Sequence, residues 1–269
     1  MTGGQGETGE TGGAALTPDE IERYARHIVL REFGGPGQMR LRRSSVLVVG
    51  AGGLGSPALL YLAAAGVGRI AIVDDDVVSL SNLQRQVIHD TPSVGTAKTE
   101  SAAARIRAIN PHVEVIGHRL RLDDANAPEL IAGHDLVLDG CDNFATRYVV
   151  NRACARAAVP LVSGAIAQWE GQLTLFDPAR GTPCYECIFP APPAEGLAPT
   201  CAEAGVIGAL PGVIGAMMAL EAIKHLAGAG RTLAGEMLIY DGLWGESRKL
   251  ALAPRADCPV CSSLRRAAG

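Results

Sequence analysis

Short apolar runs alternate with longer amphipathic stretches between residues 46 and 162. The run at 46–49 is rich in valine and closes in Gly50, and the run at 69–73 ends at Asp74, as expected for buried strands. Further strands are predicted at 113–116, 136–138 and 161–162, and helices at 57–65, 96–109 and 146–157. Strands that alternate with helices at this spacing predict an α/β fold of the Rossmann-like, doubly wound type with a mostly parallel sheet.

The pattern changes in the last hundred residues. Segments 172–176 and 248–252 alternate between apolar and polar positions, and 237–240 is a short apolar run, so we expect antiparallel C-terminal strands that extend the sheet. The proline-rich segment 178–199 predicts a long loop with a function. The uncharged stretch 204–220 is short for a bilayer crossing, which needs about 20 residues, and predicts a buried helix preceded by a loop.

The chain begins with residues that have almost nothing to bury. Residues 1–15 are mostly Gly, Thr and Glu, so we expect a disordered tail followed by a single domain at 16–269. The sequence Thr17-Pro18-Asp19-Glu20 contains the elements of a capping box and predicts a helix start. We expect one helix that continues to Phe33, ends at the glycine-rich residues 34–37 and buries Ile21, Tyr24, Ile28 and Val29.

Composition limits the classes of function. The chain has 269 residues, 48% hydrophobic and 19% charged, which excludes a disulfide mini-protein or a disordered chain. Its net charge of −4 predicts neither nucleic acid nor a membrane as a partner. No secretory signal is apparent, so we expect a soluble, cytoplasmic protein whose seven cysteines serve metal or thiol chemistry.

A glycine-rich loop follows the first strand. Gly50, Gly52 and Gly55 fit the GxGxxG pattern between a strand and a helix, where backbone N–H groups can approach phosphates. Asp74 ends the next strand, where a carboxylate can accept hydrogen bonds from ribose hydroxyls. The alternative is a tight turn without a ligand. The motif favours a nucleotide but does not distinguish NAD, FAD and ATP.

Charged and amide side chains follow the strands of the predicted sheet. Arg85 and Lys98 can stabilise charge on a triphosphate, and Asp142 after the strand at 136–138 can hold Mg²⁺. Each alone can equally be a solvated surface charge. As an ordered set at strand ends they favour ATP over a dehydrogenase cofactor.

The cysteines include two CxxC pairs. Cys184 with Cys187 and Cys258 with Cys261 can supply four thiolates to a tetrahedral Zn²⁺. A redox CxxC is the competing interpretation, and it would be favoured if a pair opened a helix after a strand. Because both pairs fall in proline-containing segments predicted as loops, we expect structural zinc.

An ordered set of motifs extends from Arg23 to Cys261. The motifs are Arg23-Tyr24-Ala25-Arg26, the glycine loop 50–55, segment 79–86, Val94-Gly95 with Lys98, Asp142-Asn143, Glu170-Gly171-Gln172 and the two cysteine pairs. By these motifs the chain resembles the ubiquitin-activating-enzyme-like adenylyltransferases, in particular the bacterial MoeB/ThiF/HesA group. It departs from that group at Gly140 and Cys141, where the family often has Cys and Thr, and at Gln168, where the molybdopterin branch usually has Arg.

The resemblance implies an adenylation reaction. The C-terminal Gly-Gly carboxylate of a small β-grasp sulfur carrier protein would attack the α-phosphate of ATP, giving an acyl-adenylate and pyrophosphate ahead of thiocarboxylate formation. It implies ATP, Mg²⁺ and structural Zn²⁺ as cofactors. We also expect a separate sulfur donor, since no rhodanese segment is apparent.

The resemblance also assigns roles to individual residues. Asp74 would bind the ribose and Asp142 the Mg²⁺, while Arg26 would reach the γ-phosphate in the opposite subunit's site, so a homodimer is expected. Cys201, after the proline-rich segment, is the candidate for a covalent link to the carrier. The other nucleotide contacts fall on Gly50, Gly52, Gly53, Gly55, Asp76, Ser81, Asn82, Arg85, Gln86, Lys98 and Asn143, of which Asn82, Arg85 and Lys98 would contact the phosphates.

Three alternatives stay open at the level of sequence. A relative of the tRNA-base dehydratase type would adenylate a non-protein substrate. An NAD-dependent oxidoreductase would use only the glycine loop and Asp74. An inactive scaffold subunit would lack the charged residues of the site, Arg26, Arg85, Lys98 and Asp142, all of which are present here. The sequence does not identify the carrier or its pathway, whether molybdopterin, thiamine, tRNA thiolation or a specialised metabolite. Cys141 and Cys154 are expected to pack as small apolar residues, and none of the six histidines has metal-ligand spacing, so none is assigned a role.

Overall fold

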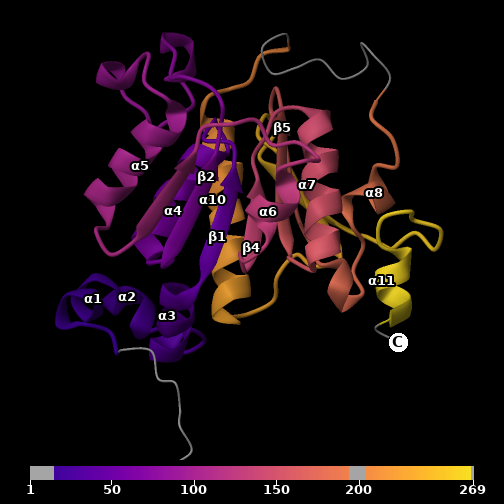
Figure 1. Cartoon of the computed structure of the whole chain (residues 1–269), viewed down its shortest axis with the longest axis horizontal. Coiled ribbons are helices and arrows are strands. Elements are labelled where there is room, and N and C mark those ends of the chain that lie inside the picture. The colour runs from indigo at the N-terminus through magenta and orange to yellow at the C-terminus, as the bar shows by residue number, and fades with distance from the viewer. Residues whose placement is uncertain (1–14, 194–203, 268–269) are drawn as a thin grey trace, which may run out of the picture.

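A mixed eight-stranded sheet forms the centre of the molecule in the computed structural model, which describes residues 15–193 and 204–267 (Figure 1). Its order is β3-β2-β1-β4-β5-β6-β7-β8; the first five strands are parallel and the last three antiparallel. The strands are β1 (Ser45–Val49), β2 (Arg69–Val73), β3 (Glu114–His118), β4 (Leu136–Asp139), β5 (Leu161–Ala167), β6 (Glu170–Phe176), β7 (Glu236–Asp241) and β8 (Glu246–Ala251). The predicted α/β fold with antiparallel C-terminal strands is confirmed.

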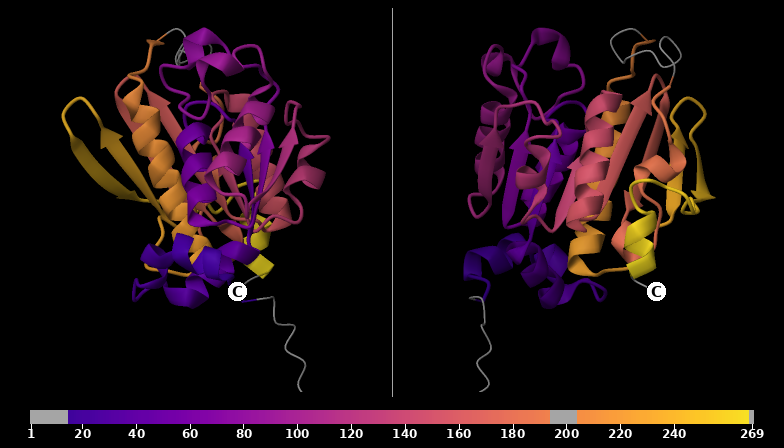
Figure 2. Two further views of the ribbon diagram at one scale, coloured as in Figure 1. Left: turned by 90° about the vertical axis from the view of Figure 1, so that its left-hand side faces the viewer. Right: turned by 45° about the vertical axis from the view of Figure 1, so that its right-hand side comes forward.

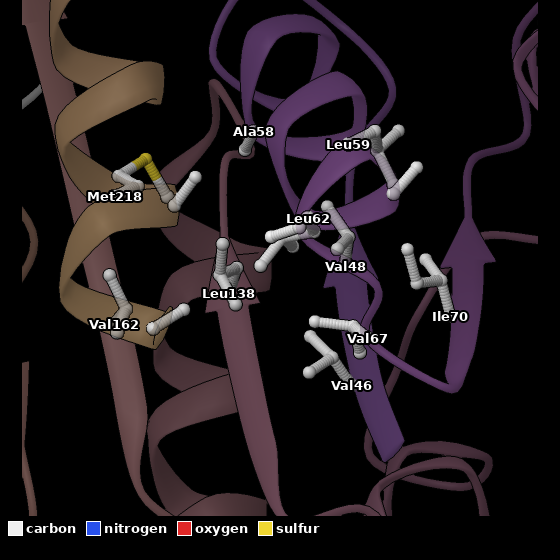
Figure 3. Close-up of a cluster of buried hydrophobic side chains, with 14 of the residues drawn as sticks. Val46, Val48, Ala58, Leu59, Leu62, Val67, Ile70, Leu138, Val162 and Met218 are labelled. Carbon is white, nitrogen blue, oxygen red and sulfur yellow. The ribbon is translucent and has the colours of Figure 1, made fainter. Parts of the chain in front are cut away.

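Alternate side chains of β1 enter two separate cores. Val46 and Val48 pack beneath the helices of one face, and Leu47 and Val49 beneath those of the other, which explains why this strand is apolar throughout. Figure 3 shows the first core, where Leu62 and Met218 cover the strands. The helices of the first face are α4 (Gly55–Ala65), α5 (Lys98–Ile109) and α10 (Ala209–Ala227), and those of the second are α6 (Ala127–Ile131) and α7 (Phe144–Ala157).

The N-terminal region departs from the prediction of one helix. The capping box forms as expected, but the chain folds into three helices, α1 (Pro18–Arg23), α2 (Ala25–Ile28) and α3 (Gly34–Arg43). The first break falls at Tyr24, whose buried ring lies against Gly66 and whose hydroxyl accepts a hydrogen bond of 2.8 Å from Asn110. This tertiary contact overrides the helical pattern.

The predicted end and the predicted buried face of that helix are also wrong. Residues 34–37 do not stop a helix but begin α3. The ring of Phe33 packs closely on Gly37, where a larger residue would be crowded. Ile21 and Val29 are 50% and 75% exposed, so Tyr24 is the buried member of the predicted set and Ile28 is half-buried.

Helix α10 is the buried helix predicted from the apolar stretch before Leu220, and it extends further, to Ala227. By length and composition alone it could cross a membrane, but half of that apolar window is buried, and the helix packs on α4 and on β5 and β6. It is therefore a core helix of this fold. The hairpin of β7 and β8 forms the edge of the sheet next to β6, and it projects outward beyond α10 (left view of Figure 2).

The remaining short elements lie in the connections. Two 3₁₀ turns precede α5 and a third follows β6. One short helix contains part of the first cysteine pair, and another follows the second pair. They are η1 (Leu80–Asn82), η2 (Thr91–Ser93), η3 (Pro178–Arg180), α8 (Tyr185–Ile188) and α11 (Ser262–Ala267).

Candidate active site and metal centre

The carboxyl ends of the parallel strands open into one cavity of about 960 Å³. Such a position, outside the strand ends where the sheet order reverses between β1 and β4, is where doubly wound folds bind ligands. Ten of the residues predicted for the nucleotide line the cavity: Gly50, Gly52, Gly53, Asp74, Asp76, Arg85, Gln86, Lys98, Asp142 and Asn143. The structure therefore brings together segments that lie up to 93 positions apart (143 − 50) in the chain.

The glycine loop has the backbone that its sequence requires. Gly50 has a φ of +90°, in the left-handed region that glycine tolerates. A Cβ at Gly55 would overlap the carbonyl oxygen of Gly50, so the first turn of α4 can approach the strand end only with glycine there. The loop thus delivers the N-terminus of an 11-residue helix, the end at which the helix dipole favours an anion, to the edge of the cavity.

Asp74 braces this loop. Its carboxylate accepts hydrogen bonds from the backbone N–H groups of Ala51, at 2.8 Å, and of Asp76, at 2.9 Å. Burial raises the pKa of Asp74, against the opposing effects of Lys98 and of these two hydrogen bonds. Each oxygen retains a lone pair, so the predicted ribose contact is compatible with this bracing.

His89 is a site residue that the sequence analysis missed. The ring lies 3.0 Å (Nε2) from the carbonyl oxygen of Ala51 and 2.9 Å (Nδ1) from the hydroxyl of Ser101. Because a carbonyl only accepts, Nε2 carries the proton and Nδ1 accepts from Ser101. Burial lowers the pKa of His89, which favours the neutral form of the ring. Nothing in its local sequence signals this role, since both partners come from other segments.

The peptide group at Ala51 is therefore fixed on both sides, by Asp74 at its N–H and by His89 at its carbonyl. The two contacts hold the glycine loop in one conformation before a ligand arrives. Such preorganisation reduces the entropy that is lost on binding.

Cations and amides surround the open part of the cavity. The Lys98 ammonium, only 7% exposed, lies 2.8 Å from the carboxylate of Asp76, and Arg85 donates to the carbonyl of Ser81 at 3.2 Å. The Oε1 atom of Gln86 is buried and has no hydrogen-bond partner within the described segments. A buried acceptor without a partner is costly, so this atom fits a site that a donor group of a ligand completes.

Some predicted site residues do not line the cavity. Gly55 lies behind the loop, and Ser81 and Asn82 lie in η1, where Asn82 accepts from the N–H of Ser79 at 3.2 Å. Arg26 lies in α2, at the end of the sheet opposite the cavity (Figure 1). Cys201 falls outside the described residues.

The two cysteine pairs form one cluster. Their sulfur atoms all lie within 4.8 Å of one another, with Cys184 3.6 Å from Cys258 and Cys187 3.4 Å from Cys261. A tetrahedral zinc ion about 2.3 Å from each sulfur would place the sulfurs about 3.8 Å apart, so the spacing fits. Asn151 contributes an outer contact: its amide lies 3.9 Å from the sulfur of Cys184.

The placement of the first pair corrects one expectation. This pair does not lie in a loop: Cys184 caps α8 and Cys187 is within it. A pair that opens a helix would by itself favour redox chemistry. The convergence of four thiols within 4.8 Å of one another fits a metal site instead. Cys141 and Cys154, by contrast, are buried apart from this cluster, as predicted, and burial raises the pKa of both thiols.

Fold, cavity and cluster together define a class: a nucleotide-binding α/β protein of the Rossmann type with a cluster of four cysteines that fits a metal ion. The chain belongs to the ThiF family, whose sequence profile matches residues 24–260. This membership confirms the family resemblance seen in the motifs.

Comparisons with individual proteins agree with this family assignment. The chain is 49% identical over 249 residues to the sulfur carrier protein adenylyltransferase of Thermus thermophilus, covering 91% of this chain and 92% of that protein. It is also 49% identical to the adenylyltransferase and sulfurtransferase MOCS3 of Aedes aegypti, but spans only 56% of that protein's length. The solved structure of E. coli MccB with AMPCPP and MccA has a TM-score of 0.78 at 23% identity, covering 89% of this chain and 74% of that one, and shows a common fold.

Proposed function

We propose that this ThiF-family chain is an adenylyltransferase that uses ATP to activate the C-terminal Gly-Gly carboxylate of a small β-grasp sulfur carrier protein. One observation carries the proposal: a single cavity joins the glycine loop, two cations and a strand-end carboxylate in a chain 49% identical to a sulfur carrier protein adenylyltransferase. This combination suits a triphosphate that loses pyrophosphate.

The reaction needs charge stabilisation and alignment. A carboxylate oxygen of the carrier attacks the α-phosphorus, and the bond to the bridging oxygen of pyrophosphate breaks. Arg85 and Lys98 stabilise the negative charge that develops on the phosphates, and the glycine loop orients them with backbone N–H groups. Asp142 would hold Mg²⁺, which when bound neutralises phosphate charge, and Asn143 beside it is a further candidate contact to the nucleotide.

The carrier tail has a path into the cavity. Beyond the nucleotide loop the cavity extends along β5 and β6, where Ser163, Ala165 and Thr174 are among its lining residues. Larger side chains such as Leu173 and Phe176 line this part as well, so it would admit only a narrow extended peptide, and two glycines are the narrowest peptide end available. Gln168, at the turn between β5 and β6, also lines this part and is a candidate contact for carrier choice.

Arg26 supports a homodimer. It cannot reach the cavity of its own chain, because α2 lies at the other end of the sheet. Close to it the apolar side chains of Val29 and Leu30 are 75% and 51% exposed, as expected at a surface that another chain covers. We infer that a second copy buries this surface and that Arg26 then completes the partner's site.

The four-cysteine cluster would hold structural zinc and fix the C-terminal segment to α8, with no part in the chemistry. A cytoplasmic location, a separate sulfur donor and a covalent role for Cys201 are the remaining parts of the proposal. The pathway that the carrier serves, molybdopterin and thiamine among the candidates, depends on the carrier itself.

The decisive experiment is pyrophosphate exchange. Purified protein is mixed with ATP, Mg²⁺, labelled pyrophosphate and each Gly-Gly carrier from the same cell, and label incorporation into ATP is measured. We expect exchange with one carrier and none with the same carrier lacking its last glycine. If label is incorporated without any carrier but in the presence of a tRNA or a small molecule, the rival relative that adenylates a non-protein substrate is supported. If no label is incorporated and the protein oxidises NADH, an oxidoreductase is supported.

A further inference from the structure

A buried guanidinium lies beneath the loop that carries Asp142. Arg147, from α7, and Asp139, at the end of β4, have side chains only 8% and 1% exposed. The Nη1 atom of Arg147 lies 3.2 Å from the Asp139 carboxylate and 3.2 Å from the Ser163 hydroxyl. Its Nη2 atom donates to the carbonyl of Cys141 at 2.7 Å and to that of Gly164 at 2.8 Å. One side chain thus joins the end of β4, the following loop and β5.

The peptide groups around Cys141 are consequently fixed on both sides. The N–H of Cys141 donates to Asp139 at 3.0 Å, and its carbonyl accepts from Arg147. On the other side of Asp142, the side chain of Asn143 caps α7 by accepting from the N–H of Thr146 at 2.9 Å. The backbone of Asp142 therefore lies between two fixed points. Its own carboxylate is exposed and has no hydrogen bond or ion pair to any residue that the structure describes.

We propose that Arg147 is a positioning residue that holds the Asp142 carboxylate in the orientation that binds the divalent cation. The inference rests on the proposed function, which assigns Asp142 to the metal. Outer contacts of this kind orient metal ligands, and their loss typically weakens metal binding about tenfold to a hundredfold. Arg147 is suited to the role because its rigid, planar guanidinium places donors on two nitrogen atoms at once, whereas the three donors of a lysine share one nitrogen on a flexible chain.

The alternative is that Arg147 only neutralises the buried charge of Asp139. Arg147→Lys separates the two roles because it keeps the positive charge and loses the paired bonds to the Cys141 and Gly164 carbonyls. Arg152→Lys is the matched control: it lies on the same helix but is partly exposed, and it pairs with Asp124 at 3.2 Å.

The test measures Mn²⁺ binding by electron paramagnetic resonance, with a non-hydrolysable ATP analogue present and no turnover. We expect Arg147→Lys to bind Mn²⁺ about tenfold more weakly than the wild type, while Arg152→Lys changes the affinity less than about twofold. In the Asp142→Ala background, Arg147→Lys should have no further effect, because the ligand that it positions is gone. In pyrophosphate exchange the half-saturating Mg²⁺ concentration of Arg147→Lys should rise in parallel.

Unchanged Mn²⁺ affinity in folded Arg147→Lys would overturn the proposal. So would a loss of affinity for the metal-free nucleotide alone, which would mean that Arg147 contacts the nucleotide directly. If Arg147→Lys does not fold, as judged by circular dichroism, Asp139→Asn replaces it; we expect about threefold weaker Mn²⁺ binding, and no change would count against the proposal. A wild type that binds Mn²⁺ with nucleotide but exchanges no pyrophosphate would refute the proposed function and leave the positioning role to be judged on binding alone.

Discussion

The nucleotide cavity and the four-cysteine cluster are both assembled from distant segments, but in opposite ways. The cavity gathers charged and glycine-rich loops at one edge of a parallel sheet and leaves side chains such as Asp142 exposed. The cluster joins α8 to the C-terminal segment and buries three of its four thiols completely. In the function proposed above, the first region binds ligands that are exchanged during the reaction, and the second stabilises the fold. Substitutions in the nucleotide cavity should therefore lower the activity, whereas substitutions in the four-cysteine cluster should lower the stability.

The largest effect is expected at Asp142. Asp142→Ala removes the proposed metal ligand, so charge on the transferring phosphate loses its stabilisation and pyrophosphate exchange should fall by about a thousandfold. The exposed side chain makes no described contact, so the melting temperature should stay close to that of the wild type. Near-normal exchange in this variant would refute the assignment.

The cysteine cluster should behave in the reverse manner. Zinc chelation or Cys258→Ser should lower the melting temperature by about 10 °C or more, because apparent binding energies of structural zinc are roughly 10 kcal/mol or more. Below the new melting temperature, the KM for ATP should change little. Cys154→Ser, at a thiol outside the cluster, is the control for a simple loss of sulfur. Protein purified under reducing conditions with no zinc in metal analysis would contradict the prediction.

Arg26 tests whether the cavity is complete within one chain. Arg26→Ala and Asp142→Ala should each be inactive alone. After subunit exchange, about half of the dimers are mixed and each has one intact site, so roughly a quarter of wild-type activity should return. Arg23→Ala is a nearby control, because Arg23 is occupied within its own chain by the carbonyl of Ile109 at 2.9 Å. If no activity returns although mass spectrometry shows mixed dimers, Arg26 does not act across an interface.

The smallest expected effect is on the pH dependence of stability, and it involves His89, which supports the glycine loop of the nucleotide cavity. Burial lowers the pKa of His89, His134 and His225 below the usual value of 6.5, so the unfolded chain binds more protons than the folded one in that range. Stability is therefore fully present above about pH 6.5 and declines as the pH falls below it. His89→Gln should make this decline shallower in urea unfolding and should raise the KM for ATP severalfold, since the glycine loop loses its brace. An unchanged pH dependence would mean that His89 does not contribute to it.

Much of this molecule could be predicted from its sequence. The strand at residues 69–73 was bounded correctly, the glycine loop and its acid were placed at a strand end, and ten of the predicted nucleotide residues meet in one cavity. These features follow from local rules: apolar runs form strands, alternating strands and helices give parallel sheets, and parallel strands end at the same edge. The cysteine spacing also predicted the four-thiol cluster, because each pair supplies half of a tetrahedral site.

Tertiary structure alone decided the rest. The helix break at Tyr24 depends on Gly66 and Asn110, and the roles of His89 and Arg147 depend on carbonyl groups of loops 38 and 6 residues away in the chain. Buried polar side chains form hydrogen bonds with backbone N–H and C=O groups that helices and strands leave without a partner. Which groups these are depends on how the chain packs, so a local sequence pattern does not predict them. The sequence determined which residues could do chemistry, and the packed fold determined which residues hold them in place.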